Sequence, residues 1–342
     1  MSDSPKVTVE ITQRQSDLAT AIARRTRSAT PQPEDATLQS AQENLAALVD
    51  AIDADEPGLF AERMAWSKSV LDHRGRGQEL ISHLRVLREV LGEQLTNHAR
   101  KVAVHYVDAA LRRVPDQTDD PPTCIDPRSP LYQLAQEYLD ALLRNQRNSA
   151  MRLIEDAVAS GASIEQIYLD VFQQCQYEIG RLWQLNQISV AQEHYATAAT
   201  QMIMSRLYPS VFATPRNGRT IIATCAAGDV HNLGIRMVSD FFEMHGYTSL
   251  YLGASTPATD LAAMVAQHAP DIVAISVSAL PHIRRATEMI ARIRDLSLPK
   301  PPKLLVGGQP FRLFPDLHRK IQADATALTA PAAIKLARTW FD

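Results

Sequence analysis

The sequence predicts a multidomain α plus α/β protein, in which two helical blocks precede a domain built on a doubly wound parallel sheet. Apolar residues first recur at the three- and four-residue spacing of helices. After residue 218, short apolar runs alternate with helical stretches, a pattern typical of a parallel sheet with helices on both faces. The chain has 342 residues, 45% of them hydrophobic, which is enough for two or three domains.

The first third of the chain divides into three segments. Residues 1–38 are rich in Ser, Thr, Gln, Pro and charged residues, so we expect a flexible arm with one short helical piece at 18–22. An N-terminal helical domain is expected at 39–114, and the proline- and aspartate-rich segment 115–128 is expected to be a linker. The leucines that recur at helix spacing in this domain include Leu80, Leu84, Leu87 and Leu91.

The second helical block, residues 129–214, predicts a four-helix bundle. Ser189 followed by Gln192 matches a capping box at the start of its last helix. The expected helices are 130–145, 147–160, 163–184 and 190–212.

The remaining residues, 219–342, predict the sheet domain. The expected strands are 219–225, 247–252, 271–277, 303–306 and 323–325. The expected helices are 233–245, 257–268, 281–295, 311–319 and 331–340.

Charge and composition limit the function classes. The net charge is −3, whereas nucleic-acid-binding domains are usually basic, so we expect no direct contact with nucleic acid. Three scattered cysteines, Cys124, Cys175 and Cys225, do not form a disulfide framework or a C-x-x-C metal site. No apolar run reaches the roughly 18 residues that a membrane span needs, and the N-terminus lacks the apolar core of a signal peptide. We therefore expect a cytoplasmic protein without membrane contact.

The loop after the first expected strand is the most informative segment. It places His231 two residues after Asp229 and three before Gly234, which opens the next helix. Ligands of doubly wound sheets bind at the carboxyl ends of the strands, where this loop lies. An imidazole can bind a metal there, and a nearby carboxylate can orient its ring. The pattern predicts a loop that presents a histidine to a metal.

The loop and two later motifs together resemble the Rossmann-like cobalamin-binding domain shared by corrinoid methyltransferases, mutases and light sensors. The pattern is Asp-x-His-x-x-Gly, then Ser-x-Leu, then Gly-Gly, and the resemblance covers 219–342. It implies that His231 is the lower axial ligand of cobalt and that Asp229 fixes its tautomer. At the usual spacing Ser276 lacks the leucine two residues later, whereas Ser278 has it, so the serine that contacts the nucleotide tail of the cofactor stays open between the two. The residues assigned to the cofactor are Asp229, Val230, Gly234, Ser276, Ser278, Leu280, Gly307 and Gly308.

The helical block before the sheet domain carries a second resemblance. Trp183, followed after nine residues by Glu193 and His194, is similar to the cap of adenosylcobalamin-dependent photoreceptors. This resemblance implies that Trp183 packs over the adenosyl group and that Glu193 hydrogen-bonds it. It also implies a non-catalytic light sensor, a homo-oligomer whose assembly changes on illumination. Gln184 stands where some members have a histidine, which leaves the upper cobalt ligand after illumination open between His194, another group and water.

The N-terminal helical domain takes the place of the DNA-binding domain of the best-known B12 photoreceptors. That layout is similar to photocobilins, which hold a bilin in helical surroundings, and it implies biliverdin as a second chromophore. Cys124 is a further, weaker candidate for covalent attachment. The residues considered as bilin contacts are Arg74, Arg76, Arg85, Arg88, His73, His83, His98, His105 and Tyr106.

Two alternative functions remain open at the level of the sequence. One is a corrinoid carrier that moves methyl groups between methyltransferases. The other is a cobalamin-binding transcriptional antirepressor that acts by protein contact. A mutase subunit is less expected because nothing in the sequence resembles the barrel that holds its substrate. The signalling partner is not evident from the sequence.

Overall fold

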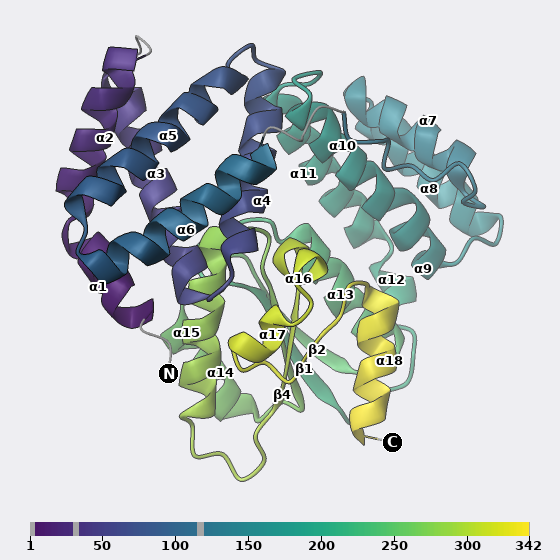
Figure 1. Cartoon of the computed structure of the whole chain (residues 1–342). Coiled ribbons are helices and arrows are strands. Elements are labelled where there is room, and N and C mark those ends of the chain that lie inside the picture. The colour runs from purple at the N-terminus through teal and green to yellow at the C-terminus, as the bar shows by residue number, and fades with distance from the viewer. Residues whose placement is uncertain (1–3, 30–33, 115–119, 342) are drawn as a thin grey trace.

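The computed structural model describes residues 4–29, 34–114 and 120–341. Figure 1 shows an N-terminal helical domain, a second helical block and a sheet domain below both. The predicted fold class is confirmed: two helical blocks precede a parallel five-stranded sheet. Residues 115–119 of the expected linker, and residues 1–3 and 30–33 of the expected arm, lie outside the described residues.

The N-terminal helical domain contains helices from the start of the described chain. Their contacts with one another are extensive, and α4 packs against both α5 and α6. The helices are α1 (Ser4–Gln13), α2 (Gln15–Ala29), α3 (Glu34–Asp53), α4 (Pro57–Asp72), α5 (Gly77–Gln94) and α6 (Asn97–Arg113).

The expectation of a flexible arm at 1–38 is wrong for the described residues. Ile11, Leu18 and Ile22 are fully buried, and α1 and α2 pack against α3, α5 and α6. The Glu10 carboxylate also accepts hydrogen bonds from the backbone and hydroxyl of Thr96. Composition misled the prediction because a few apolar residues at helix spacing are enough to dock a helix that is otherwise polar.

The second helical block, called the cap here, follows the predicted order of helices. The predicted capping box is present, since the Ser189 hydroxyl accepts from the Gln192 N–H and the Gln192 side chain accepts from the Ser189 N–H. The third expected helix contains a π-helical stretch that the sequence pattern did not reveal. The elements are α7 (Tyr132–Leu143), α8 (Arg147–Ala159), α9 (Ile164–Gln166), η2 (Ile167–Gln173), α10 (Gln174–Gln184), α11 (Val190–Arg206) and α12 (Tyr208–Val211).

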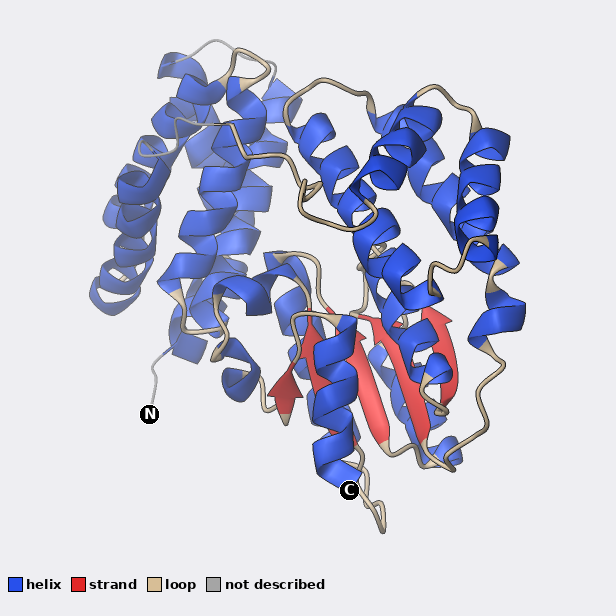
Figure 2. Cartoon of the chain, turned by 90° about the vertical axis from the view of Figure 1, so that its right-hand side faces the viewer, coloured by secondary structure: helices blue, strands red, loops and turns tan. Residues whose placement is uncertain are grey.

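The sheet has the order β2-β1-β3-β4-β5, and each neighbouring pair of strands is parallel. Figure 2 shows the strand arrowheads pointing toward the helical blocks. The chain reverses its winding direction between β1 and β3, the place where such sheets bind ligands. The strands are β1 (Thr220–Cys225), β2 (Thr248–Gly253), β3 (Ile272–Ser276), β4 (Lys303–Gly307) and β5 (Ala325–Thr326).

Helices cover both faces of the sheet, as a doubly wound fold requires. The expected helix at 311–319 is two short helices instead, because Pro315 disfavours a helical conformation at Phe314. The remaining elements are α13 (Leu233–Met244), α14 (Ala258–His268), η3 (Leu280–His282), α15 (Ile283–Arg294), α16 (Gln309–Leu313), α17 (Leu317–Lys320) and α18 (Ala330–Phe341).

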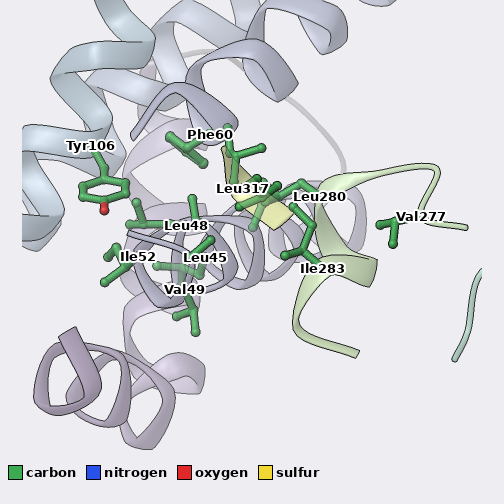
Figure 3. Packing of buried hydrophobic residues seen from close by; sticks show 14 of the residues in the cluster. Leu45, Leu48, Val49, Ile52, Phe60, Tyr106, Val277, Leu280, Ile283 and Leu317 are labelled. Atoms are coloured by element: carbon green, nitrogen blue, oxygen red, sulfur yellow. The ribbon is translucent and has the colours of Figure 1, made fainter. Parts of the chain in front are cut away.

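Alternate residues of β1 belong to two different cores. Ile221 and Ala223 pack with α13, α18 and the cap, whereas Ile222 packs with α14 and α15. The second of these cores continues into the N-terminal helical domain. Figure 3 shows Leu48 and Ile52 of α3 gathered with Leu280 and Ile283 of the sheet domain. The N-terminal domain is therefore fixed to the sheet domain by a shared apolar core.

No helix among the described residues is both long and apolar enough to cross a membrane.

Candidate functional site

The loop between β1 and α13 presents His231 to solvent while a buried carboxylate holds the ring. The His231 side chain is 72% exposed, whereas the Asp229 side chain is fully buried. Asp229 Oδ1 lies 3.1 Å from His231 Nδ1 and also accepts the His231 backbone N–H at 3.0 Å. Because Nδ1 faces Asp229, the other ring nitrogen, Nε2, remains available for a metal.

Ser278 completes this arrangement from the end of the next strand in the sheet. Its backbone N–H donates to Asp229 Oδ2 at 2.7 Å, and its hydroxyl donates to Asp229 Oδ1 at 2.8 Å. The hydroxyl oxygen also lies 3.1 Å from His231 Nδ1. The carboxylate thus accepts hydrogen bonds from two segments that are far apart in the sequence.

These hydrogen bonds fix the charge of Asp229. Burial by itself would raise the pKa of this carboxyl, but hydrogen bonds from His231 and Ser278 lower it to about 2. The hydrogen bond to Asp229 in turn raises the pKa of His231, and burial offsets part of that effect. Asp229 is therefore a carboxylate at neutral pH, and it can increase the basicity of the imidazole that faces a metal.

The remaining predicted residues of the sheet domain occupy different environments. Val230 is 68% exposed at the tip of the loop, whereas Leu280 is buried in the core shared with α3. Ser276 ends β3 opposite Gly307, and its carbonyl accepts the Ala226 N–H. Of the two serines left open, Ser278 is the one whose side chain meets Asp229 and His231.

The three predicted glycines differ in what a side chain would meet. A Cβ at Gly234 would face open space, so its absence leaves the surface beside the loop clear. Gly308 has φ +111°, and a Cβ there would lie 1.9 Å from the Val277 carbonyl oxygen. A Cβ at Gly307 would lie 3.0 Å from the Ala327 carbonyl oxygen. Gly308 is therefore required by the backbone of the sheet domain itself.

In the cap, Trp183 and Glu193 lie at the two ends of the short connection between α10 and α11. Trp183 lies in the last turn of α10, and Glu193 lies in the first turn of α11. The Glu193 carboxylate accepts the Thr197 hydroxyl at 2.9 Å and bonds His194 Nδ1 at 2.5 Å. The His194 side chain is 74% exposed. Glu193 is also close enough to His231 for its charge to favour the protonated imidazole.

The sequence analysis missed a contact from the N-terminal helical domain onto the cap. Trp66 of α4 stacks on Trp183, with the ring centroids 6.0 Å apart and the planes at 24°. The Arg74 guanidinium lies 5.3 Å from the centre of the Trp183 ring, and Gln184 Nε2 donates to Ser69 Oγ at 2.9 Å. No local sequence signal could identify this contact, because the partners are more than 100 residues apart.

The residues considered as bilin contacts do not form one cluster. Arg76 and Arg88 are paired with Glu79 and Asp108, and both arginines are exposed. His73 bonds the Ser69 carbonyl and Asp120 beside the cap. Burial raises the pKa of the Cys124 thiol, which disfavours the thiolate needed for covalent attachment.

Two further candidates lie inside the N-terminal domain. Tyr106 is buried, and its ring meets the exposed ring of His105 edge to face. His83 is also buried, and its Nε2 has no hydrogen-bond partner among the described residues.

The donor set tests which kind of metal could bind. Within the described ranges, no group of three or more His, Cys, Asp or Glu side chains could hold a metal ion. A bare ion normally needs three or four protein ligands. The single exposed imidazole of His231 therefore suits a metal that brings its own equatorial ligands, as cobalt does in a corrin ring, and the loop fits that group.

Comparison with known proteins agrees with this geometry. The B12 binding domain family matches residues 219–335, which include the His231 loop. A second family, also described as a B12 binding domain, matches residues 134–208 of the cap. Both B12-binding regions are therefore present, in the order cap then sheet.

Two curated relatives are similar over different lengths. The chain is 31% identical over 123 residues to the HTH-type transcriptional repressor CarA of Myxococcus xanthus, covering 41% of that protein. It is 26% identical over 211 residues to monomethylamine corrinoid protein 1 of Methanosarcina acetivorans, covering 60% of this chain and 87% of that one.

A solved structure, the monomethylamine corrinoid protein of Methanosarcina barkeri, matches with a TM-score of 0.56. The match covers 62% of this chain and all of that one at 21% identity, and it shows a shared fold. Both matched B12 binding domains, the corrinoid relatives and the presented histidine together support the binding of cobalamin by this chain.

Proposed function

We propose that this protein is a non-catalytic light sensor that uses adenosylcobalamin. The observation that carries the proposal is the position of Trp183 and Glu193 at the two ends of the short connection between α10 and α11, with the charge of Glu193 acting on His231. A large aromatic ring and a carboxylate suit an upper ligand with a planar base and hydroxyl groups, whereas a methyl group offers neither.

The roles of the chain's residues follow from their contacts. His231 would hold cobalt through its imidazole, with the ring fixed by Asp229 and Ser278. Trp183 and Glu193 would lie against the upper ligand. When bound, adenosylcobalamin supplies a cobalt–carbon bond that visible light breaks. Trp183 and Glu193 would then lose a packing partner, and the cap would shift toward a different arrangement on the sheet domain.

We expect this shift to change the association of subunits. The test is to load the full chain with adenosylcobalamin in the dark, illuminate it with green light, and record the absorption spectrum and the mass in solution. A changed spectrum together with a changed mass supports the proposal. An unchanged spectrum and mass would rule out the light sensor.

A corrinoid methyl carrier is the second candidate, favoured by the match to 87% of monomethylamine corrinoid protein 1. The two functions predict different preferences for the upper ligand. A carrier binds methylcobalamin at least as tightly as adenosylcobalamin and exchanges its methyl group with a thiol acceptor through a methyltransferase. A sensor prefers adenosylcobalamin, and Trp183→Ala removes that preference without weakening binding of hydroxocobalamin.

A transcriptional antirepressor is the third candidate, favoured by the likeness to the CarA repressor over 123 residues. In that case the loaded chain would bind a DNA-binding protein rather than change its own mass. Mass measurement of the chain alone distinguishes this function from the sensor, because an antirepressor without its partner keeps its mass in both dark and light.

Biliverdin as a second chromophore is proposed on one observation. The buried His83 in the N-terminal helical domain has an Nε2 without a hydrogen-bond partner among the described residues. A ring nitrogen or propionate of a bilin could take that position. Addition of biliverdin should give a far-red band that travels with the chain on gel filtration, and His83→Leu should abolish it. The absence of a band with the unmodified chain would exclude the second chromophore.

A further inference from the structure

We infer that the N-terminal helical domain takes part in recognising the upper ligand, and that Trp66 of α4 is the positioning residue through which it does so. This inference rests on the proposed function. It adds a specific role for a domain that lies outside both matched B12-binding regions.

The first observation is that α4 holds two consecutive residues at the end of α10. Trp66 stacks on Trp183, and Ser69 accepts a hydrogen bond from Gln184. Trp66 and Ser69 are three residues apart, so they lie on one face of α4. The position of Trp183 is thus set by the N-terminal domain as well as by the cap.

The second observation is that Trp66 remains open to solvent although it is stacked. Its side chain is 45% exposed, which is unusual for a tryptophan at a contact between two domains. One face of its ring stacks on Trp183, and nearly half of the residue is open to solvent in the described part of the chain. This exposed aromatic surface beside Trp183 would add a second apolar ring to the proposed site of the upper ligand.

The third observation is that α4 reaches toward the His231 loop as well as toward the cap. Arg63, one turn before Trp66, acts electrostatically on His282 at the end of η3, and α4 packs against η3. A Cβ at Gly228, in the loop that presents His231, would lie 3.9 Å from His282 Nδ1. One helix therefore contacts both the end of α10 and η3, which adjoins the loop that presents His231.

These contacts give the upper ligand a direct route to the N-terminal domain. A planar group against Trp183 favours the arrangement in which the Trp66–Trp183 stack and the Gln184–Ser69 hydrogen bond are formed. Its loss removes that preference, so α4 becomes free to separate from α10. The signal would then pass from the cap to the N-terminal domain through α4.

Hydrogen exchange of the full chain tests this route. We expect the amides of α4 to exchange at least about fivefold more slowly with adenosylcobalamin in the dark than with hydroxocobalamin, and illumination should abolish the difference. Trp66→Ala should remove the protection of α4 but leave that of α11. Trp66→Phe, which keeps an aromatic ring, should retain it. Binding of adenosylcobalamin to Trp66→Ala should weaken by about tenfold, with hydroxocobalamin unaffected.

Trp340→Ala is the matched control. Trp340 is next to Phe341, whose ring contacts Arg219. Arg219 lies at the amino end of β1, whereas the His231 loop follows its carboxyl end. This variant should show the full protection of α4.

The outcomes separate the inference from the function on which it rests. Suppose that the unmodified chain binds adenosylcobalamin and responds to light, but α4 exchanges equally with both cobalamins or Trp66→Ala behaves like Trp340→Ala. The inference is then wrong and the light sensor stands. Failure of the unmodified chain to bind adenosylcobalamin or to respond to light would remove both.

Discussion

At the scale of single residues, His231 is held in a metal-ready orientation by the chain itself. Asp229 accepts two hydrogen bonds from His231 and two from Ser278, and it remains ionised because its pKa is lowered to about 2. A ligand whose ring is fixed in advance loses less conformational freedom when it binds. Folding already orients the imidazole, so this loss of conformational freedom occurs before any cofactor binds.

His231→Ala should abolish the absorption bands that a histidine-bound cobalamin gives, because no other residue of the loop carries an imidazole. Ser278→Ala should keep those bands but weaken cobalamin binding by about tenfold, the lower end of the effect of removing a partner of a metal ligand. Val9→Ala, at an exposed position of α1 outside the residues assigned to the cofactor, is the control and should bind normally. The visible spectrum and a titration measure both effects. Histidine-bound bands in His231→Ala would refute the assignment of the ligand.

A second prediction concerns a buried carboxyl between the cap and the sheet domain. Asp240 is 3% exposed and accepts the Tyr168 hydroxyl at 2.8 Å, and burial raises its pKa from 3.8 to about 6. The folded state therefore binds this proton more tightly than the unfolded state, so stability falls as the pH rises from about 4 to 6. Asp240→Asn keeps an acceptor for Tyr168 and removes the charge.

We expect Asp240→Asn to raise the free energy of unfolding at pH 7.5 by up to ~3 kcal/mol, which corresponds to a shift of about two pKa units. At pH 4 the variant and the unmodified chain should be almost equally stable. Urea unfolding at the two pH values measures the difference. An equal effect at both would show that the charge of Asp240 is not the cause.

The residues of the site differed in how far the sequence could predict them. Asp229 and His231 could be predicted because their contact is local, two residues apart in one loop. The contact of Ser278 with Asp229 and His231 could not be predicted, because it depends on where β3 ends relative to β1. Trp66 could not be predicted at all, because only tertiary packing brings α4 to Trp183.

At the scale of elements, the start of α11 illustrates a helix end that the sequence specifies fully. Ser189 and Gln192 satisfy each other's backbone N–H groups, and the same turn carries Glu193. Ser189→Ala should lower the free energy of unfolding by about 1 kcal/mol, the usual effect of losing a capping hydroxyl. Gln187→Ala, at an exposed position in the preceding turn, is the control. Thermal unfolding measures both variants. Equal stability of the two would contradict the role of the Ser189 hydroxyl at the start of α11.

Elements with a strong period or a local end signal were predicted, whereas those defined by docking were not. The strands and helices of the sheet domain followed from the alternation of apolar runs, apart from the interruption at Pro315. Helices α1 and α2 were missed because their polar composition outweighed a few buried residues such as Ile11 and Leu18. The π-helical stretch Ile167–Gln173 has no sequence period that distinguishes it from an α-helix.

At the scale of the whole molecule, the shared core makes the N-terminal helical domain part of the sheet domain's stability. Leu48 of α3 is fully buried in the cluster that contains Leu280 and Ile283 (Figure 3). The two domains also share an ion pair, in which Asp50 Oδ1 of α3 lies 3.3 Å from Arg284 Nε of α15. A change in the position of the N-terminal domain would therefore act on the elements that border the His231 loop.

Leu48→Ala tests this coupling directly. Removal of a fully buried leucine should lower the free energy of unfolding by about 2–5 kcal/mol. The sheet domain should lose stability together with the N-terminal domain, because the truncated side chain belongs to the core that both share.

Two probes can follow the two domains separately. In a Trp66→Phe, Trp183→Phe background, the fluorescence of Trp340 reports on the sheet domain and circular dichroism reports on the helices. Both transitions should move down by the same amount in Leu48→Ala, whereas Leu313→Ala, at a position 44% exposed, should move neither. A Trp340 transition that stays in place while the helical signal falls would mean that the two domains unfold separately, and that the N-terminal domain has no mechanical link to the site through this core.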